Sequence, residues 1–83
     1  MLSGQGKPVY GPHARLRMAR RNVAEADVEH VLANHDMAAT DPDGNARLSG
    51  EIAPGRRLLI VVAKGSSPPF IITVWPTGRR RRV

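Results

Sequence analysis

The spacing of the apolar residues changes near residue 36, and this change limits the chain to a mixed fold. Up to Asp36 apolar residues recur at helical intervals, whereas beyond it short apolar runs rich in β-branched residues are separated by turn residues. With 83 residues the chain can build one hydrophobic core but not two. We therefore expect one α+β domain, in which two N-terminal helices pack on one face of a three- to four-stranded antiparallel sheet.

Two helices are predicted, over residues 12–21 and about 24–34. Pro12 is typical of a first helical position, because its φ is preset and its missing N–H would be unbonded there anyway. Glu25 and Asp27 fall in the first turn of the second helix, where they favour the positive end of the helix dipole. This structural role explains the acidic residues better than a catalytic one.

One edge of the first predicted helix is a row of nitrogen-bearing side chains. Ala14 and Met18 form a narrow apolar stripe at helical spacing. Three basic side chains adjoin this stripe at intervals of one turn: His13, Arg17 and Arg21. Imidazole and guanidinium groups aligned in this way are suited to receive a phosphate.

The second half of the chain predicts strands joined by tight turns. Asp41–Gly44 has the residue order of a β-turn, with aspartate first, proline second and glycine last. Alternating polar and apolar residues over 47–52 predict a strand with one solvent-facing side. The almost uninterrupted apolar run over 57–64 predicts a central strand that is buried on both faces.

The last predicted strand, over residues 70–75, has two interpretations. Strict alternation divides it into two faces, with Phe70, Ile72 and Val74 on one and Ile71, Thr73 and Trp75 on the other. Thr73 and Trp75 then project together and present a hydroxyl to phosphate and an aromatic plate to a base. Alternatively, Trp75 covers the edge of the core, and Thr73 is present because threonine favours strands.

Charge is segregated along the chain. Residues 1–24 contain five basic and no acidic residues, residues 25–51 contain all seven acidic residues against one arginine, and the remainder contains seven basic residues. Two basic segments around an acidic one predict a bipolar molecule that meets a polyanion on one side. The alternative is that the arginines at 79–82 only make the end of the chain soluble.

The composition excludes disulfides and favours a protein without a membrane segment. The chain has no cysteine, and its apolar runs are far shorter than the roughly 20 residues that span a bilayer. His30 and His35 lie five positions apart with no matching acidic pair, so no metal site is expected. We expect a cytoplasmic protein with no cofactor and no membrane partner, and the sequence predicts no particular oligomeric state.

The chain is expected to divide into one folded domain and two polar ends. Residues 1–11 lack the apolar core of a secretion signal and predict a flexible N-terminal arm. Residues 12–76 contain all of the predicted helices and strands. Residues 77–83 include four consecutive arginines and predict a basic, disordered tail.

The order of residues in the helical segment and the last strand resembles the bacterial domain of unknown function 4258 family. That family's pattern is His-Ala, Arg-Met and Arg, then a helix start of the form Ile-Ser-x-x-Asp-Ile, and a late strand ending in Thr-Val-Tyr. The matching residues are His13, Ala14, Arg17, Met18, Arg21, Asp27, Val28, Thr73 and Val74. Trp75 stands where the family usually has tyrosine, and the resemblance covers about residues 12–76.

This family is similar to the small RNase-toxin fold of RelE-like, BrnT-like, barnase-like and colicin-type domains, which has helices first and then an antiparallel sheet. The resemblance implies RNA as the substrate and an antitoxin or immunity protein as the partner. Trp75 has no phenol, so it cannot supply chemistry that needs one at this position.

The candidate catalytic residues lie on the first helix and the last strand. Metal-free RNA cleavage needs a base for the 2′-hydroxyl, an acid for the departing 5′-oxygen and cations around the phosphorane. His13 suits one of the proton transfers, and Arg17 and Arg21 suit the phosphate oxygens. The predicted catalytic set is His13, Arg17, Arg21 and Thr73. The alternative is that His13 bonds to the backbone, while the arginines face water or pair with the acidic helix.

The candidate nucleic-acid-binding residues are mostly arginines outside that set. They are Arg20, Arg56, Arg57, Lys64, Trp75, Arg79, Arg80, Arg81 and Arg82. The leading hypothesis is a small RNase-toxin-like domain that binds RNA, with metal-free cleavage by 2′-hydroxyl attack as its candidate activity. One alternative is a non-catalytic nucleic-acid-binding module, whose affinity falls steeply with salt. The other is a protein-interaction domain whose acidic helix contacts a basic partner.

Overall fold

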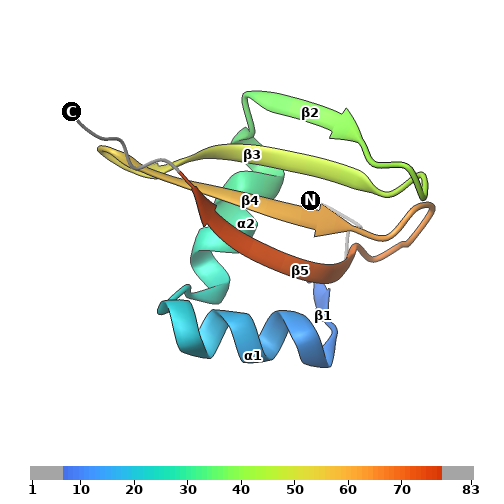
Figure 1. Ribbon diagram of the computed structural model, residues 1–83, viewed down its shortest axis with the longest axis horizontal. Coiled ribbons are helices and arrows are strands. Elements are labelled where there is room, and N and C mark those ends of the chain that lie inside the picture. The colour runs from blue at the N-terminus through green and yellow to red at the C-terminus, as the bar shows by residue number, and fades with distance from the viewer. Residues whose placement is uncertain (1–6, 78–83) are drawn as a thin grey trace.

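The computed structural model describes residues 7–77 and confirms the α+β class (Figure 1). The elements in chain order are β1 (Val9–Tyr10), α1 (Pro12–Arg21), α2 (Glu25–Asn34), β2 (Met37–Thr40), β3 (Ala46–Ala53), β4 (Arg56–Val62) and β5 (Phe70–Thr77). Both helices lie where the sequence predicts them, to within one residue. Neither helix within residues 7–77 is long and apolar enough to cross a membrane.

The sheet is larger than predicted, and it is mixed. Five strands lie in the order β1-β5-β4-β3-β2. The strands from β2 to β5 form the expected antiparallel meander, whereas β1 pairs in parallel with β5. The prediction of three to four antiparallel strands was therefore only partly right, because a fifth strand joins the sheet from the N-terminal side of the helices.

That fifth strand belongs to the segment predicted as an N-terminal arm. Val9 N–H donates to the Pro69 carbonyl at 2.8 Å, and Gly11 N–H donates to the Ile71 carbonyl at 3.0 Å. A strand of two residues carries no periodic pattern, so the sequence shows no sign of it. The rest of the predicted arm up to residue 6, and the predicted tail from residue 78, lie outside the described residues.

The two helices pack against different parts of the sheet. Helix α2 contacts β3 and β4, whereas α1 runs along β5 and lies below it in the view of Figure 1. The predicted packing of both helices on one face is therefore only partly confirmed. Helix α1 begins at Pro12 and ends at Arg21, as predicted, and it is capped by Asn22, which has a left-handed backbone with φ of 58°. This C-terminal turn sends the chain directly into α2.

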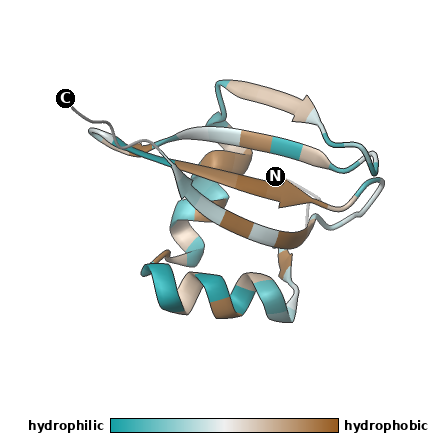
Figure 2. Cartoon of the chain, viewed as in Figure 1, coloured by the Kyte–Doolittle hydropathy of each residue, from teal (hydrophilic) through white to brown (hydrophobic). Residues whose placement is uncertain are grey.

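The core lies between the helices and one side of the sheet. Strand β4 is the most continuously hydrophobic strand in Figure 2, but only alternate residues of it are fully buried. The buried side chains are Ala14, Met18, Val23, Val28, Val31, Leu58, Ile60, Val62, Ile71 and Val74. Leu59 and Val61 point to the other side and are half-buried. The prediction that this strand is buried on both faces was wrong, because no helix of the described chain covers the second face.

We call this second side the open face. The registers of the strands place eleven side chains on it: Met37, Ala39, Arg47, Ser49, Glu51, Arg57, Leu59, Val61, Thr73, Trp75 and Thr77. Along two rows across the sheet, Arg47 aligns with Val61 and Thr73, and Ser49 aligns with Leu59 and Trp75. The open face therefore mixes an apolar floor with polar and aromatic groups.

A bulge in β5 corrects the predicted alternation of that strand. Val61 pairs with Thr73 while Val62 pairs with Ile71, so Ile72 has no partner on β4. The extra residue puts both Ile71 and Val74 into the core, although they are three positions apart. Strict alternation had predicted that Ile71 shares a face with Thr73 and Trp75. This prediction was wrong, because Ile71 lies in the core.

The bulge makes a direct prediction about two neighbouring isoleucines. Ile71→Ala should lower the free energy of unfolding by about 2–5 kcal/mol, because the side chain is fully buried and its loss leaves a cavity. Ile72→Ala should lower it by only about 1 kcal/mol, because that side chain is half-buried. Urea denaturation of both variants measures the difference, and equal losses would contradict the bulged register.

Candidate nucleic-acid interface

The imidazole of His13 lies exposed in the first turn of α1. Arg17, one turn further on, donates from Nε to His13 Nε2 at 3.4 Å. Within residues 7–77 the ring therefore bonds to a side chain and not to the backbone, which was the structural alternative for this residue. Nε2 of His13 accepts this hydrogen bond, which assigns the ring to the tautomer with its proton on Nδ1.

Trp75 on β5 lies against the same edge of α1. The Arg17 guanidinium carbon lies 3.9 Å from the centre of the indole ring, and that of Arg21 lies 5.9 Å from it. Both distances are within the roughly 6 Å range of a cation–π interaction. The indole remains 44% exposed. The first helix and the last strand thus bring His13, Arg17, Arg21 and Trp75 into one group, which we call the α1–β5 cluster.

The opposite side of α1 is used for structure. Arg15 stacks on Tyr10 with its guanidinium carbon 4.5 Å from the ring centre, and it also pairs with Glu25 at 2.6 Å. Burial of the phenol, followed by the negative charges of Glu25 and Glu29, raises the pKa of Tyr10 to about 12. These contacts join β1, α1 and α2. Arg15 therefore links β1 to α2 through its contacts with Tyr10 and Glu25.

The acidic start of α2 has the structural role predicted for it. Asp27 Oδ2 accepts a hydrogen bond from the Ala24 backbone N–H at 3.0 Å, and Glu25 is held by Arg15. Both carboxylates lie in the first turn, where the helix dipole favours them. No group of three metal-ligating side chains occurs among the residues that the structure describes.

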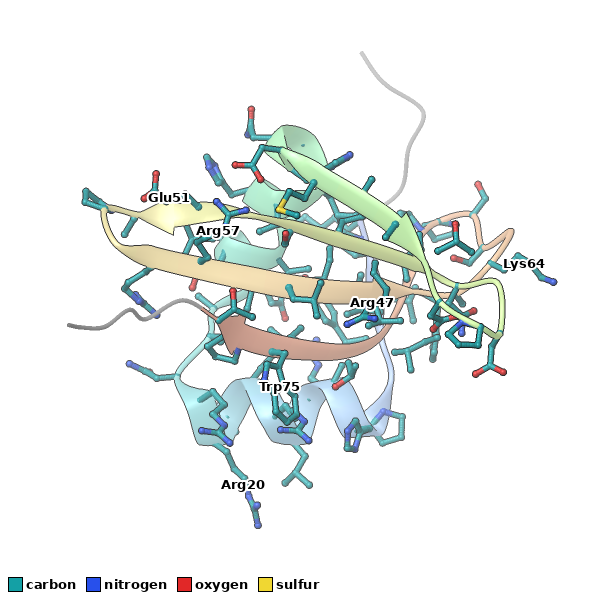
Figure 3. The ribbon with its side chains drawn as sticks, turned by 45° about the horizontal axis from the view of Figure 1, so that its top comes forward. Arg20, Arg47, Glu51, Arg57, Lys64 and Trp75 are labelled. Carbon is teal, nitrogen blue, oxygen red and sulfur yellow. The ribbon has the colours of Figure 1, made fainter. Side chains whose placement is uncertain are left out.

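Arg47 joins the interface from β3, and the sequence interpretation missed it. It lines a hollow of about 320 Å³ on the open face, together with Asp41, Leu59, Val61, Thr73 and Trp75. In Figure 3 Arg47 lies over the middle of the sheet, while Trp75 reaches from β5 toward α1. One signal was present, since Arg47 is the only arginine or lysine in the acidic segment and alternates with apolar neighbours. Its alignment with Thr73 depends on the register and could not be predicted.

Thr73 lies where the sequence suggested, but its hydroxyl is not presented to solvent. Its Oγ1 is buried and has no hydrogen-bond partner in the structure. The residue lines the hollow next to Val61, its partner on β4. A phosphate at the α1–β5 cluster could bond to this hydroxyl only after a change of rotamer.

The remaining predicted binding residues do not gather at this cluster. Arg57 donates to both carboxylate oxygens of Asp36, at 2.6 and 3.1 Å. Lys64 lies at the far end of the sheet, and Arg20 projects from α1 away from the sheet (Figure 3). Arg56 is exposed at the start of β4. The four residues Arg79, Arg80, Arg81 and Arg82 lie outside the described residues.

These features define a small α+β protein with an aromatic and basic cluster where its first helix meets its last strand. Residues 10–76 match the family model described as Domain of unknown function (DUF4258), and the chain belongs to this family. Neither the comparison with curated proteins nor the comparison with solved structures found a match.

The ion pair of Arg57 predicts a pH dependence. The hydrogen bond and the charge of Arg57 lower the pKa of Asp36. A carboxyl whose pKa is depressed by folding contributes stability above its usual pKa of about 3.9, and this contribution is lost as the pH falls through the lowered value. Arg57→Met should therefore raise the pKa of Asp36, measured by NMR titration of its side chain. Arg56→Met is the matched control and should leave that pKa unchanged.

The chain has one tryptophan, so its fluorescence reports on the α1–β5 cluster alone. Arg17→Ala should shift Trp75 emission to longer wavelength and increase quenching by acrylamide, because the guanidinium no longer covers the ring. The free energy of unfolding should fall by about 0.5–1 kcal/mol. Arg20→Ala, which removes the same charge from the same helix, should leave the emission as it is. Identical spectra for the two variants would show that Arg17 does not cover the indole in solution.

Proposed function

We propose that this protein is a small RNA-binding domain of the RNase-toxin type, which binds single-stranded RNA at the α1–β5 cluster and cleaves it there. The observation that carries the proposal is the contact of Arg17 with both the exposed indole of Trp75 and the imidazole of His13. An aromatic plate, a planar cation and a proton acceptor thus lie close together on an exposed edge. The indole fits a base, the guanidinium fits a phosphate, and the imidazole fits the ribose 2′-hydroxyl.

Binding follows from stacking and from charge. A base that stacks on the exposed part of Trp75 gains about 1–3 kcal/mol, largely independent of its identity. The following phosphate then lies near the guanidinium groups of Arg17 and Arg21, which offer forked donors to its oxygens. Single-stranded RNA supports this arrangement better than a duplex, because its bases are free to leave the stack.

Cleavage follows from the position of His13. When the Arg17 guanidinium turns from His13 Nε2 to the phosphate, this nitrogen is free to take the proton of the ribose 2′-hydroxyl. The 2′-oxygen then attacks the adjacent phosphorus. Arg17 stabilises the additional negative charge on the phosphorane. The bond from phosphorus to the 5′-oxygen then breaks, and this oxygen takes a proton from water. The products are a 2′,3′-cyclic phosphate and a 5′-hydroxyl, and the reaction needs no metal ion.

The proposal extends to partner and location. A domain of this type is similar to RelE-like and BrnT-like toxins, and its neutralising partner is an antitoxin or immunity protein that covers the α1–β5 cluster. The place of action is the cytoplasm, where RNA is available. Both points rest on the proposed RNA chemistry.

A non-catalytic RNA-binding module is the second candidate, and the buried Thr73 hydroxyl favours it. With that hydroxyl withdrawn, His13 is the single acid–base group of the predicted catalytic set that is exposed at the cluster. Under this hypothesis the same residues bind RNA and release it intact, and affinity falls steeply with salt.

End-labelled single-stranded RNA incubated with the protein and a chelator distinguishes the two candidates. The proposal predicts fragments that carry a 2′,3′-cyclic phosphate. His13→Ala should slow their formation at least about 100-fold while RNA affinity changes little, because the base is lost and the arginines remain. His30→Ala, an exposed histidine on α2, is the matched control and should cleave normally. Intact RNA with undiminished binding would support the module, and equal cleavage by both variants would contradict the role of His13.

A further inference from the structure

The hollow on the open face lies directly beside Trp75 but has no role in the chemistry above. Its floor is apolar and consists of Leu59 and Val61. Asp41 and Arg47 also line it, so an acidic and a basic residue border the same space. A volume of about 320 Å³ is at the lower end of small-ligand sites and exceeds what a single planar base occupies.

The carboxyl group of Asp41 is held in place by the turn that follows β2. Its Oδ1 accepts hydrogen bonds from the backbone N–H groups of Asp43 and Asn45, both at 2.9 Å. Its Oδ2 has only a long contact of 3.5 Å with the side-chain amide of Asn45. One oxygen therefore orients the group, and the other has capacity to accept further hydrogen bonds.

Asp41 and Arg47 have opposite charges and line one hollow, yet they do not pair with each other. The ion pairs within residues 7–77 join Arg15 to Glu25 and Arg57 to Asp36. An acceptor and a forked donor thus stand apart above an apolar floor, with an indole at the side. A ligand that fits them is planar, and it carries acceptors on one edge and donors on the next.

We propose that this hollow is a guanine-binding subsite, which rests on the proposed RNA-binding function and gives it a base preference. Guanine presents two neighbouring acceptors, O6 and N7, to the guanidinium of Arg47. Its adjacent edge presents two neighbouring donors, N1–H and the 2-amino group, to the carboxylate of Asp41. Adenine and cytosine offer one amino group, and uracil offers one ring N–H, so no other standard base supplies both pairs. Leu59 and Val61 support the face of the ring.

The register explains how one RNA strand reaches both places. Trp75 and Leu59 are directly paired on neighbouring strands, and Arg47 aligns with Val61 in the next row. Neighbouring strands are about 4.8 Å apart, so β3 and β5 are roughly 10 Å apart. The side chains of Arg47 and Trp75 span this distance by lining the same hollow. One RNA strand can therefore place one base in the hollow and another on Trp75.

Fluorescence anisotropy with short 2′-O-methyl oligonucleotides tests the subsite, since these RNAs resist 2′-hydroxyl attack. The probes are an all-uridine strand and the same strand with one central guanosine, inosine, adenosine or cytidine. The guanosine probe should bind about tenfold more tightly than the uridine probe, as expected for one good bidentate contact. Inosine lacks the 2-amino group and should fall between guanosine and adenosine.

The matched variants are Asp41→Asn and Asp43→Asn, which remove the same charge from the same turn. The amide that Asp41→Asn introduces keeps an oxygen for the turn and presents an N–H donor to the hollow, so the guanosine preference should disappear while uridine binding is retained. Asp43→Asn should keep the preference, because Asp43 does not line the hollow. Arg47→Lys keeps the charge without the fork and should reduce the preference, which gives a second reading if Asp41→Asn unfolds.

The outcomes separate the two proposals. Equal affinity for all of the probes overturns the guanine subsite and leaves the RNA-binding proposal standing. A guanosine preference that survives in both Asp41→Asn and Arg47→Lys also overturns the subsite. No binding to any probe overturns both proposals.

Discussion

The packing of α1 against β5 is the constraint on which the rest of the interface depends. Only Ala14 and Met18 of this helix are buried, so a narrow stripe of two residues sets its rotation. With that stripe against the sheet, His13 and Arg17 must lie on the border that meets Trp75. The Arg17 guanidinium then packs on the indole and covers the junction between α1 and β5. Figure 2 shows how little hydrophobic surface α1 has. Its position on the sheet therefore depends on these few contacts.

The bulge in β5 determines which side chains of this strand enter the core and which lie on the open face. By inserting Ile72 between paired residues, it lets Ile71 and Val74 both enter the core while Thr73 and Trp75 stay on the open face. The same strand thereby stabilises the fold and lines the hollow. A regular strand could do only one of these along its length, because one shift of register exchanges the two faces.

Much of the fold was predictable, since strong local signals agree with the final packing. Pro12 and the spacing of Ala14 and Met18 predicted α1, and the edge of His13 and Arg17 followed from the same geometry. The bulge was not predictable, because Ile71 and Ile72 are both apolar and fit either face. The pairing of Arg57 with Asp36 and the role of Arg47 depend on strand register, which joins residues far apart in the chain. The predicted RNA chemistry itself stays a prediction.

The central claim is that one surface, formed by α1, β5 and β3, receives single-stranded RNA. NMR titration of the protein with a guanosine-containing RNA, followed through backbone amide and indole N–H signals, tests it most directly. The account predicts the largest changes at the Trp75 indole, in the first turns of α1 and around Arg47. Changes confined to α2 or to the end of the sheet near Lys64, or no change at all, would contradict it.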